Sequence, residues 1–169
     1  MIYRIFVEKK DNLQAKKVKE EAKNLLSIND ITDVRLLIRY DVQGMTEEEL
    51  EAAIPGVFSE PPVDNVYREK VQFGRDYAVF AIAYLTGQYD QRADSAAQCV
   101  QLLTQGERPA VATAKVIGLK GQVSDQEFEK IKQYLINPVE SRQASLEKPE
   151  SLEMRADVPA DVARVTGFT

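Results

Sequence analysis

The chain has 169 residues, with 22 basic and 27 acidic side chains, a net charge of −5 and no histidine. Apolar residues make up 44% and charged residues 29%, a balance typical of a folded globular protein. The two signs of charge are interspersed and slightly acidic overall, which argues against a nucleic-acid or anionic-membrane surface. The lack of histidine removes Ser-His-Asp and Cys-His catalysis and most zinc sites.

The sequence also indicates the cell compartment. No apolar run approaches the about 20 residues that cross a bilayer, and residues 1–5 begin a strand pattern at once, without a secretory signal. The single cysteine, Cys99, cannot form an internal disulfide and fits a reducing cytosol. We therefore expect a cytoplasmic protein.

The first half alternates strand and helix patterns. Residues 2–9 are rich in β-branched and aromatic side chains and predict a strand, and residues 34–42 predict a second one. Between them, residues 12–26 predict an amphipathic helix. Its apolar face is formed by Ala15, Val18, Ala22, Leu25 and Leu26.

The first half continues with a short helix and an edge strand. Thr46 and Glu49 have the spacing of a capping box, and Pro55 ends the helix near Ile54. Residues 64–73 mix apolar and charged side chains, which suits an edge strand.

The second half begins with an apolar run at residues 77–85, which predicts a buried strand broken by Gly87. Asp90 then caps a helix by accepting from the free amides of its first turn. The apolar face of this helix is unusually small, which lets it lie close to a sheet or another helix. It is formed by Ala93, Ala96, Ala97, Val100 and Leu103.

A strand at residues 112–120 and a helix at residues 124–135 follow. Ser124 and Glu127 form a second capping-box pattern. The apolar stripe of this helix consists of Phe128, Ile131 and Leu135, and the Asn137–Pro138 pair ends it.

The two halves repeat each other in outline. Tyr3 to Phe6 matches Tyr77 to Phe80, residues 34–42 match 112–120, and Gly44 matches Gly121. The pattern strand–helix–strand–helix occurs twice, and each half has room for an extra strand at its end. We predict an α+β fold of duplicated ferredoxin-like units, with a mainly antiparallel sheet and the helices on one face. Whether the two sheets pair edge to edge or pack face to face stays open.

This pattern divides the chain into three parts. Residues 1–74 form the first repeat, residues 75–138 the second, and residues 139–169 an extended arm, where Pro149 and Pro159 interrupt any sustained period. The last residues, Gly167–Thr169, have neither a polar tail nor a helix cap. We expect the arm to lead into further domains of a larger protein.

No residue pattern predicts catalysis, a cofactor or a metal. Glycines are scattered singly, so there is no phosphate-binding loop. The acidic run Glu47–Glu51 is explained by the positive end of a helix dipole rather than by a metal. Without a histidine to activate it, Cys99 is interpreted as a small packed thiol and not as a nucleophile.

Two polar segments are candidates for a domain interface. The alternative for both is ordinary helix capping, a helix stop and a solvated face. The first segment surrounds the start of the helix after Asp90, and the second follows the last predicted helix. The candidate interface residues are Gln88, Tyr89, Asp90, Gln91, Arg92, Asp94, Gln98, Asn137, Glu140 and Arg142.

These two segments also carry a family resemblance. Residues 87–99 (GQYDQRADSAAQC) and residues 134–142 (YLINPVESR) are similar to the amino-terminal region of phosphoribosylformylglycinamidine synthase, in its large single-chain type. Residues 3–10 and 57–61 fit as well, so the resemblance spans nearly the whole chain. The two longer motifs are specific, whereas the strand matches are weak alone.

The resemblance implies a function for the parent enzyme. That enzyme is an ATP- and Mg-dependent carbon–nitrogen ligase of purine biosynthesis, which takes its amide nitrogen from glutamine. Its synthetase and glutaminase parts would lie downstream, and Cys99 matches no glutaminase motif. This chain would be the amino-terminal domain, similar to two fused copies of a small subunit, and inactive by itself.

Two functional hypotheses remain. In the first, the chain is a non-catalytic assembly domain whose partners are the synthetase and glutaminase domains of the same polypeptide, where it supports ammonia transfer. In the second, it is a stand-alone ferredoxin-like binding or sensor module that dimerises through an exposed sheet. Neither hypothesis includes a nucleic acid or a membrane, and the isolated fragment could form homodimers under either.

Overall fold

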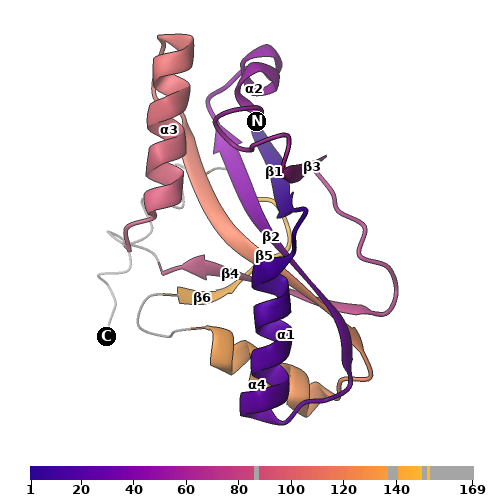
Figure 1. Cartoon of the computed structure of the whole chain (residues 1–169). Helices are drawn as coiled ribbons and strands as arrows, with labels where there is room; N and C mark the ends of the chain where they lie inside the picture. Colours follow the sequence, from indigo (N-terminus) through magenta and orange to yellow (C-terminus); the bar gives the residue numbers. More distant parts are fainter. Residues whose placement is uncertain (86–87, 137–140, 150–151, 153–169) are drawn as a thin grey trace, which may run out of the picture.

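The computed structural model describes residues 1–85, 88–136, 141–149 and 152. These residues form strands and helices in the order β-α-β-α-β, twice in succession (Figure 1). The elements are β1 Ile2–Lys9, α1 Leu13–Leu26, β2 Ile31–Gln43, α2 Glu47–Ala53, β3 Asp64–Arg68, β4 Tyr77–Tyr84, α3 Gln91–Thr104, β5 Ala110–Gly121, α4 Asp125–Leu135 and β6 Ser141–Ala144.

The strands form one antiparallel sheet in the order β3-β1-β2-β5-β4-β6. The long strands β2 and β5 pair along their whole length, from Ile31 opposite Gly121 to Gln43 opposite Ala110. The two repeats therefore pair edge to edge and make a continuous sheet. The predicted edge strand at residues 64–73 is β3, which lies at one edge and is shorter than expected. The fold is α+β with a ferredoxin-like arrangement of duplicated units.

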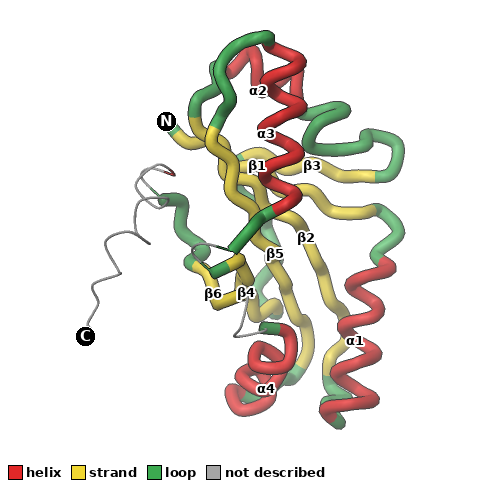
Figure 2. Tube along the Cα trace, turned by 90° about the vertical axis from the view of Figure 1, so that its left-hand side faces the viewer, coloured by secondary structure: helices red, strands yellow, loops and turns green. Residues whose placement is uncertain are grey.

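The described helices all pack on one face of the sheet, as two pairs at opposite ends (Figures 1 and 2). Alternate residues of each strand point to this face, which we call the helix-covered face. At one end, α1 and α4 enclose a core that includes Val18, Phe80 and Ile131. At the other end, α2 and α3 enclose a core that includes Leu50 and Val100.

Each core takes residues from both halves of the chain. Val18 of α1, in the first half, shares a core with Ile117 of β5. Val100 of α3, in the second half, shares a core with Ile5 and Val42 of the first. Although the sequence repeats, the two halves are therefore not separately packed bodies.

Helix starts agree with the predicted caps. The Asp90 carboxylate accepts a hydrogen bond from the Ala93 amide at 3.0 Å, which begins α3. Both predicted capping boxes are present, at the start of α2 and of α4. Gly121 ends β5 with a φ of 136°, and a Cβ there would lie 2.1 Å from the Asp30 carbonyl oxygen, so only glycine fits.

Some side chains that the helical patterns placed inside lie outside. The small face of α3 is buried as expected, but Leu103 is 51% exposed. Leu25 of α1 is 62% exposed. Both leucines lie in the last turn of their helices.

The internal repeat is displaced by one residue from the alignment of the tyrosines. Tyr3 packs into the core of α2 and α3, whereas Tyr77 lies on the opposite face and donates a hydrogen bond to Asp33. Ile5 and Phe80 are the equivalent residues, since both point to the helix-covered face. A shift of one residue reverses the face of every side chain in a strand. The strand pairing does not reveal this shift. If Tyr3 is matched with Tyr77 and Val42 with Lys120, each matched pair still consists of residues that lie opposite each other in the sheet.

The opposite, helix-free face contains buried charges. Arg4 donates to both carboxylate oxygens of Asp41, at 2.7 and 3.0 Å, and Arg39 lies 3.9 Å from the same carboxylate. Arg4 and Arg39 are each 4% exposed and Asp41 is 2% exposed. A bidentate guanidinium–carboxylate pair is among the stronger hydrogen-bonded contacts in proteins.

The start of the predicted arm crosses this helix-free face. Residues 141–144, within the range assigned to the arm, form the edge strand β6 on β4. Arg4 then donates to the carbonyl oxygen of Leu146 at 2.7 Å, and Arg39 donates to that of Ser145 at 2.8 Å. Residues 150–151 and 153–169 of the predicted arm lie outside the described residues. Across the described ranges, no helix combines the length and the apolar character needed to cross a membrane.

Candidate functional site

A groove runs across the helix-covered face, between the two pairs of helices. It consists of two hollows that both reach the side chain of Arg92, in the first turn of α3. The first-half pocket has a volume of about 460 Å³ and lies over β1 and β2. The second-half pocket has a volume of about 140 Å³ and lies over β4 and β5. Together these two pockets are our candidate site.

The two pockets are equivalent positions of the internal repeat. We match Ile5 with Phe80, and Ile38 with Lys115, which lie opposite each other in the sheet. The strands that line the first-half pocket, β1 and β2, then correspond to those that line the second-half pocket, β4 and β5. Gln14 and Arg92 also correspond, each lying two residues after the N-cap of its helix. The equivalent lining pairs are Val7 with Ile82, Lys9 with Tyr84, Leu36 with Thr113, and Ile38 with Lys115.

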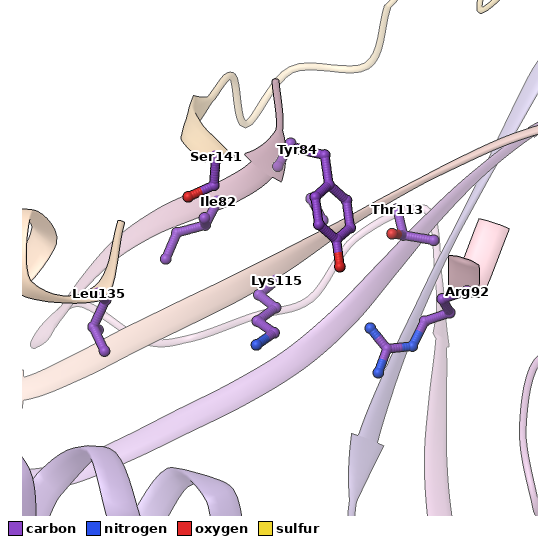
Figure 3. A pocket seen from close by; sticks show the side chains of 9 residues that line it. Ile82, Tyr84, Arg92, Thr113, Lys115, Leu135 and Ser141 are labelled. Atoms are coloured by element: carbon purple, nitrogen blue, oxygen red, sulfur yellow. The ribbon is translucent and has the colours of Figure 1, made fainter. Parts of the chain in front are cut away.

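The second-half pocket collects positive charge. Figure 3 shows the guanidinium of Arg92, the ammonium of Lys115 and the hydroxyl of Tyr84 directed into the same space. Among the described residues, Arg92 and Lys115 have neither a hydrogen bond nor an ion pair. Of the described residues that line this pocket, none is acidic. The arrangement therefore offers two uncompensated cations and a hydroxyl at one place.

Asp90 lies two residues before Arg92, but its oxygens already accept hydrogen bonds. One oxygen accepts from the Ala93 amide, and the other accepts from the Thr113 amide at 3.1 Å and from the Thr113 hydroxyl at 2.7 Å. Asp90 thus fixes the first turn of α3 to β5. This holds Arg92 over the groove from a rigid element.

The first-half pocket has an apolar floor and an ion pair on its rim. Asp64 is 6% exposed and its carboxylate lies 3.1 Å from the Lys9 ammonium, while its second oxygen accepts from the Glu60 amide. Tyr40 is 7% exposed, and no described residue forms a hydrogen bond with its hydroxyl. Burial raises the pKa of Tyr40, and the nearby Arg92 guanidinium opposes that rise. The Tyr40 hydroxyl therefore stays protonated at neutral pH.

The structure separates the predicted interface residues. Asp90 is internal, and Arg92 lies on the groove. Asp94 accepts from the Tyr89 hydroxyl at 2.7 Å and pairs with Arg108 on the outer surface. Gln88, Gln91 and Gln98 are exposed.

The second predicted segment is only partly described. Asn137 and Glu140 lie outside the described residues. Arg142 lies in β6 opposite Ala83, half-buried, on the helix-free face and away from α3. The structure therefore does not bring Arg142 together with the α3 residues.

Sequence reasoning placed Cys99 wrongly and missed most of the groove. Cys99 is exposed on the outer side of α3, next to its buried face and not within it. Tyr84, Lys115 and Tyr40 gave no signal, because each looks like an ordinary strand residue. Alternation would have placed Lys115 on the apolar side of β5, where a lysine is unusual.

Within the described ranges, no cluster of three or more cysteine, aspartate and glutamate side chains is placed to hold a metal ion.

Comparison with known proteins does not identify the chain. No protein-family model matches it, and no curated protein matches it either.

Proposed function

We propose that this chain is the non-catalytic amino-terminal domain of an ATP- and glutamine-dependent phosphoribosylformylglycinamidine synthase of purine biosynthesis. It would hold the synthetase and glutaminase domains of the same polypeptide together and support the transfer of ammonia. The observation that carries the proposal is the likeness of residues 87–99 and 134–142 to that family. The ATP, the Mg²⁺ and the bond-forming chemistry would belong to the downstream domains.

The fold supports this proposal in one respect. Two fused small subunits would give two copies of one β-α-β-α-β unit. The described residues contain that order twice, in a sheet whose centre is the pair of Ile38 and Lys115. Fusion at the edge between β2 and β5 also explains why each core uses both halves.

The outer side of α3 is the surface that we assign to the partner domains. It presents Gln88, Gln91 and Gln98 together with Tyr89, which is 67% exposed. Because Asp90 fixes the start of α3 to β5, Gln91 and Gln98 are displayed from a rigid helix, and Gln88 and Tyr89 come directly before its N-cap. Tyrosine and polar side chains on a rigid support are typical of protein–protein contacts.

Complementation tests the proposal. A parent enzyme lacking residues 1–169 is mixed with this chain, and amidine formation is measured with glutamine and, separately, with ammonia. Restoration of the glutamine-driven rate alone indicates that the chain couples the two active sites. Restoration of both rates indicates that it shapes the synthetase site. If neither rate changes and no complex forms, the assembly function is wrong.

A pair of matched variants locates the surface. Replacing Gln91 and Gln98 by alanine on α3 should reduce the restored rate severalfold, through loss of affinity between the two chains. Replacing the exposed residues Lys17 and Asn24 of α1 by alanine should leave the rate unchanged. Equal effects of the two double variants would place the contact elsewhere.

The groove favours a second candidate function, a stand-alone binding or sensor module that dimerises. An apolar hollow with a few convergent polar groups is the usual form of a small-molecule site. Under this alternative, the chain sediments as a dimer at micromolar concentration and does not restore the truncated enzyme. A monomer that complements the enzyme excludes it.

A further inference from the structure

The most unusual unassigned feature is the pair of uncompensated cations in the second-half pocket. We propose that the groove binds a phosphate monoester, with its phosphate between Arg92 and Lys115 and its organic part over the first-half pocket. This inference does not depend on the proposed function, because it rests on the groove and not on the outer side of α3.

The second-half pocket fits the phosphate end. Its described lining residues include Arg92 and Lys115 but no carboxylate, although the chain as a whole has a net charge of −5. A guanidinium offers two parallel donors that match the oxygens of a phosphate, and a lysine adds a compact positive charge. The Tyr84 hydroxyl, directed into the same space, supplies a third donor (Figure 3). Two cations match the double negative charge of a monoester better than the single charge of a carboxylate.

The size of the second-half pocket is also suitable. Its volume is about 140 Å³, whereas one water molecule needs roughly 10–15 Å³ of such space. An oxyanion and a few waters can therefore enter. The Asp90 carboxylate does not compete for the two cations, because its oxygens accept from Ala93 and Thr113.

The first-half pocket fits the organic end. Leu36, Ile38 and Val7 give it an apolar floor, and its volume of about 460 Å³ lies within the usual range for small-molecule sites. Tyr40 lines this pocket, and its hydroxyl, which has no hydrogen-bond partner among the described residues, is a donor for a polar atom on that part.

Charge fixes the orientation of the ligand. Counting the described residues, three carboxylates line the first-half pocket and repel an anion, whereas none lines the second-half pocket. The three are Asp11, Glu60 and Asp64, and within the described part of the chain only Asp64 is paired with a lysine. The phosphate is therefore directed to the end of the groove that holds Lys115, and the uncharged part extends toward Tyr40.

Titration with phenyl phosphate, followed by backbone amide NMR shifts, tests the proposal, with inorganic phosphate and phenol as the separate halves of the probe. We expect saturable shifts on both pockets, near Thr113 to Lys115 and near Ile38 to Tyr40. Phenyl phosphate should bind more tightly than either half alone. No saturable shift at millimolar probe, or shifts confined to another surface, overturns the proposal. If inorganic phosphate binds as tightly as phenyl phosphate, the first-half pocket does not hold the organic part of the ligand, and that part of the proposal is overturned.

Matched variants separate the site from general charge effects. Arg92→Gln gives α3 the residue that α1 has at the equivalent position, and Lys115→Gln removes the second charge. Each substitution should weaken the binding of phenyl phosphate roughly tenfold or more, because it removes one charge-assisted hydrogen bond. The controls Arg108→Gln and Lys17→Gln make the same charge changes outside the groove and should bind as the original chain does. Equal weakening by site and control variants would contradict the proposal.

A chemical measurement guards against a variant that fails to fold. Lys115 is exposed, so an acylating reagent should modify it in the original chain. Phenyl phosphate should slow the modification of Lys115 and leave that of Lys17 unchanged. Lack of protection at Lys115 would again overturn the proposal.

Discussion

At the scale of single residues, the buried carboxylate of Asp41 is the clearest determinant of stability. It accepts two hydrogen bonds from Arg4 and lies 3.9 Å from Arg39, and all three side chains are almost fully buried. Asp41→Asn removes the negative charge and leaves two guanidinium groups in a poorly solvated place. We expect a loss of about 3–5 kcal/mol in the free energy of unfolding, measured by urea titration.

An exposed ion pair provides the control for that substitution. Glu51 pairs with Arg68 on the surface, and its side chain is 59% exposed. Glu51→Gln should change the free energy of unfolding by less than about 1 kcal/mol, because water and salt screen such pairs. Similar losses for both variants would mean that burial of the Asp41 network contributes little.

Tyr77 gives a prediction about pH. Its hydroxyl donates to Asp33 at 2.5 Å, and this bond, with partial burial, raises the pKa of Tyr77 to about 12. In the unfolded chain the pKa is about 10, so the unfolded state loses this proton first. The stabilisation from Tyr77 is therefore complete below about pH 10 and is lost as the pH rises toward 12.

Carbon NMR of the labelled tyrosine rings measures this titration directly. The resonances of the Tyr77 ring should titrate at about pH 12. Asp33→Asn removes the charged acceptor and should bring the pKa of Tyr77 back toward its ordinary value. A pKa that stays unchanged in Asp33→Asn would assign the shift to burial alone.

At the scale of elements, α3 is held more firmly than an ordinary surface helix. Asp90 caps its first turn and also accepts two hydrogen bonds from Thr113 of β5, which is 8% exposed. Asp90→Ala should lower the free energy of unfolding more than Ser124→Ala, which removes only the exposed cap of α4. We expect about 1 kcal/mol for Ser124→Ala and about 2–4 kcal/mol for Asp90→Ala. Equal losses in thermal or urea unfolding would contradict a role for Asp90 beyond capping.

Local signals were sufficient to predict most elements. Capping boxes and prolines depend on residues a few positions apart, and both predicted boxes are present at α2 and α4. The alignment of the repeats failed by one residue because Tyr3 and Tyr77 look alike, although they lie on opposite faces. Which face a strand residue occupies is decided by the tertiary packing of the helices, which the repeat pattern does not contain.

The groove could not be predicted for a related reason. Arg92, Tyr40 and Lys115 come from three different elements, and only the pairing of β2 with β5 brings them to one place. The start of the arm is similar, because residues 145–149 show no periodicity of their own. Their position is set by hydrogen bonds from Arg4 and Arg39, far away in the sequence.

At the scale of the whole molecule, each core contains residues from both halves of the chain, which predicts a single cooperative unfolding transition. Val18 of α1 and Val100 of α3 each pack in a core that contains strands of the other half. Val18→Ala and Val100→Ala should each lower the free energy of unfolding by roughly 2 kcal/mol. Because the cores share one sheet, either variant should reduce the hydrogen-exchange protection of β1 and of β4 by the same factor.

An exposed residue of α3 completes this test. Leu102 is 79% exposed, so Leu102→Ala should change stability by less than about 0.5 kcal/mol. If the halves were independent, Val100→Ala would reduce protection on one side of the β2–β5 pairing only, and urea unfolding would show two steps. A single step shifted by either variant means that the repeat in sequence has become one folding unit. The groove between the helix pairs would then disappear together with the rest of the fold.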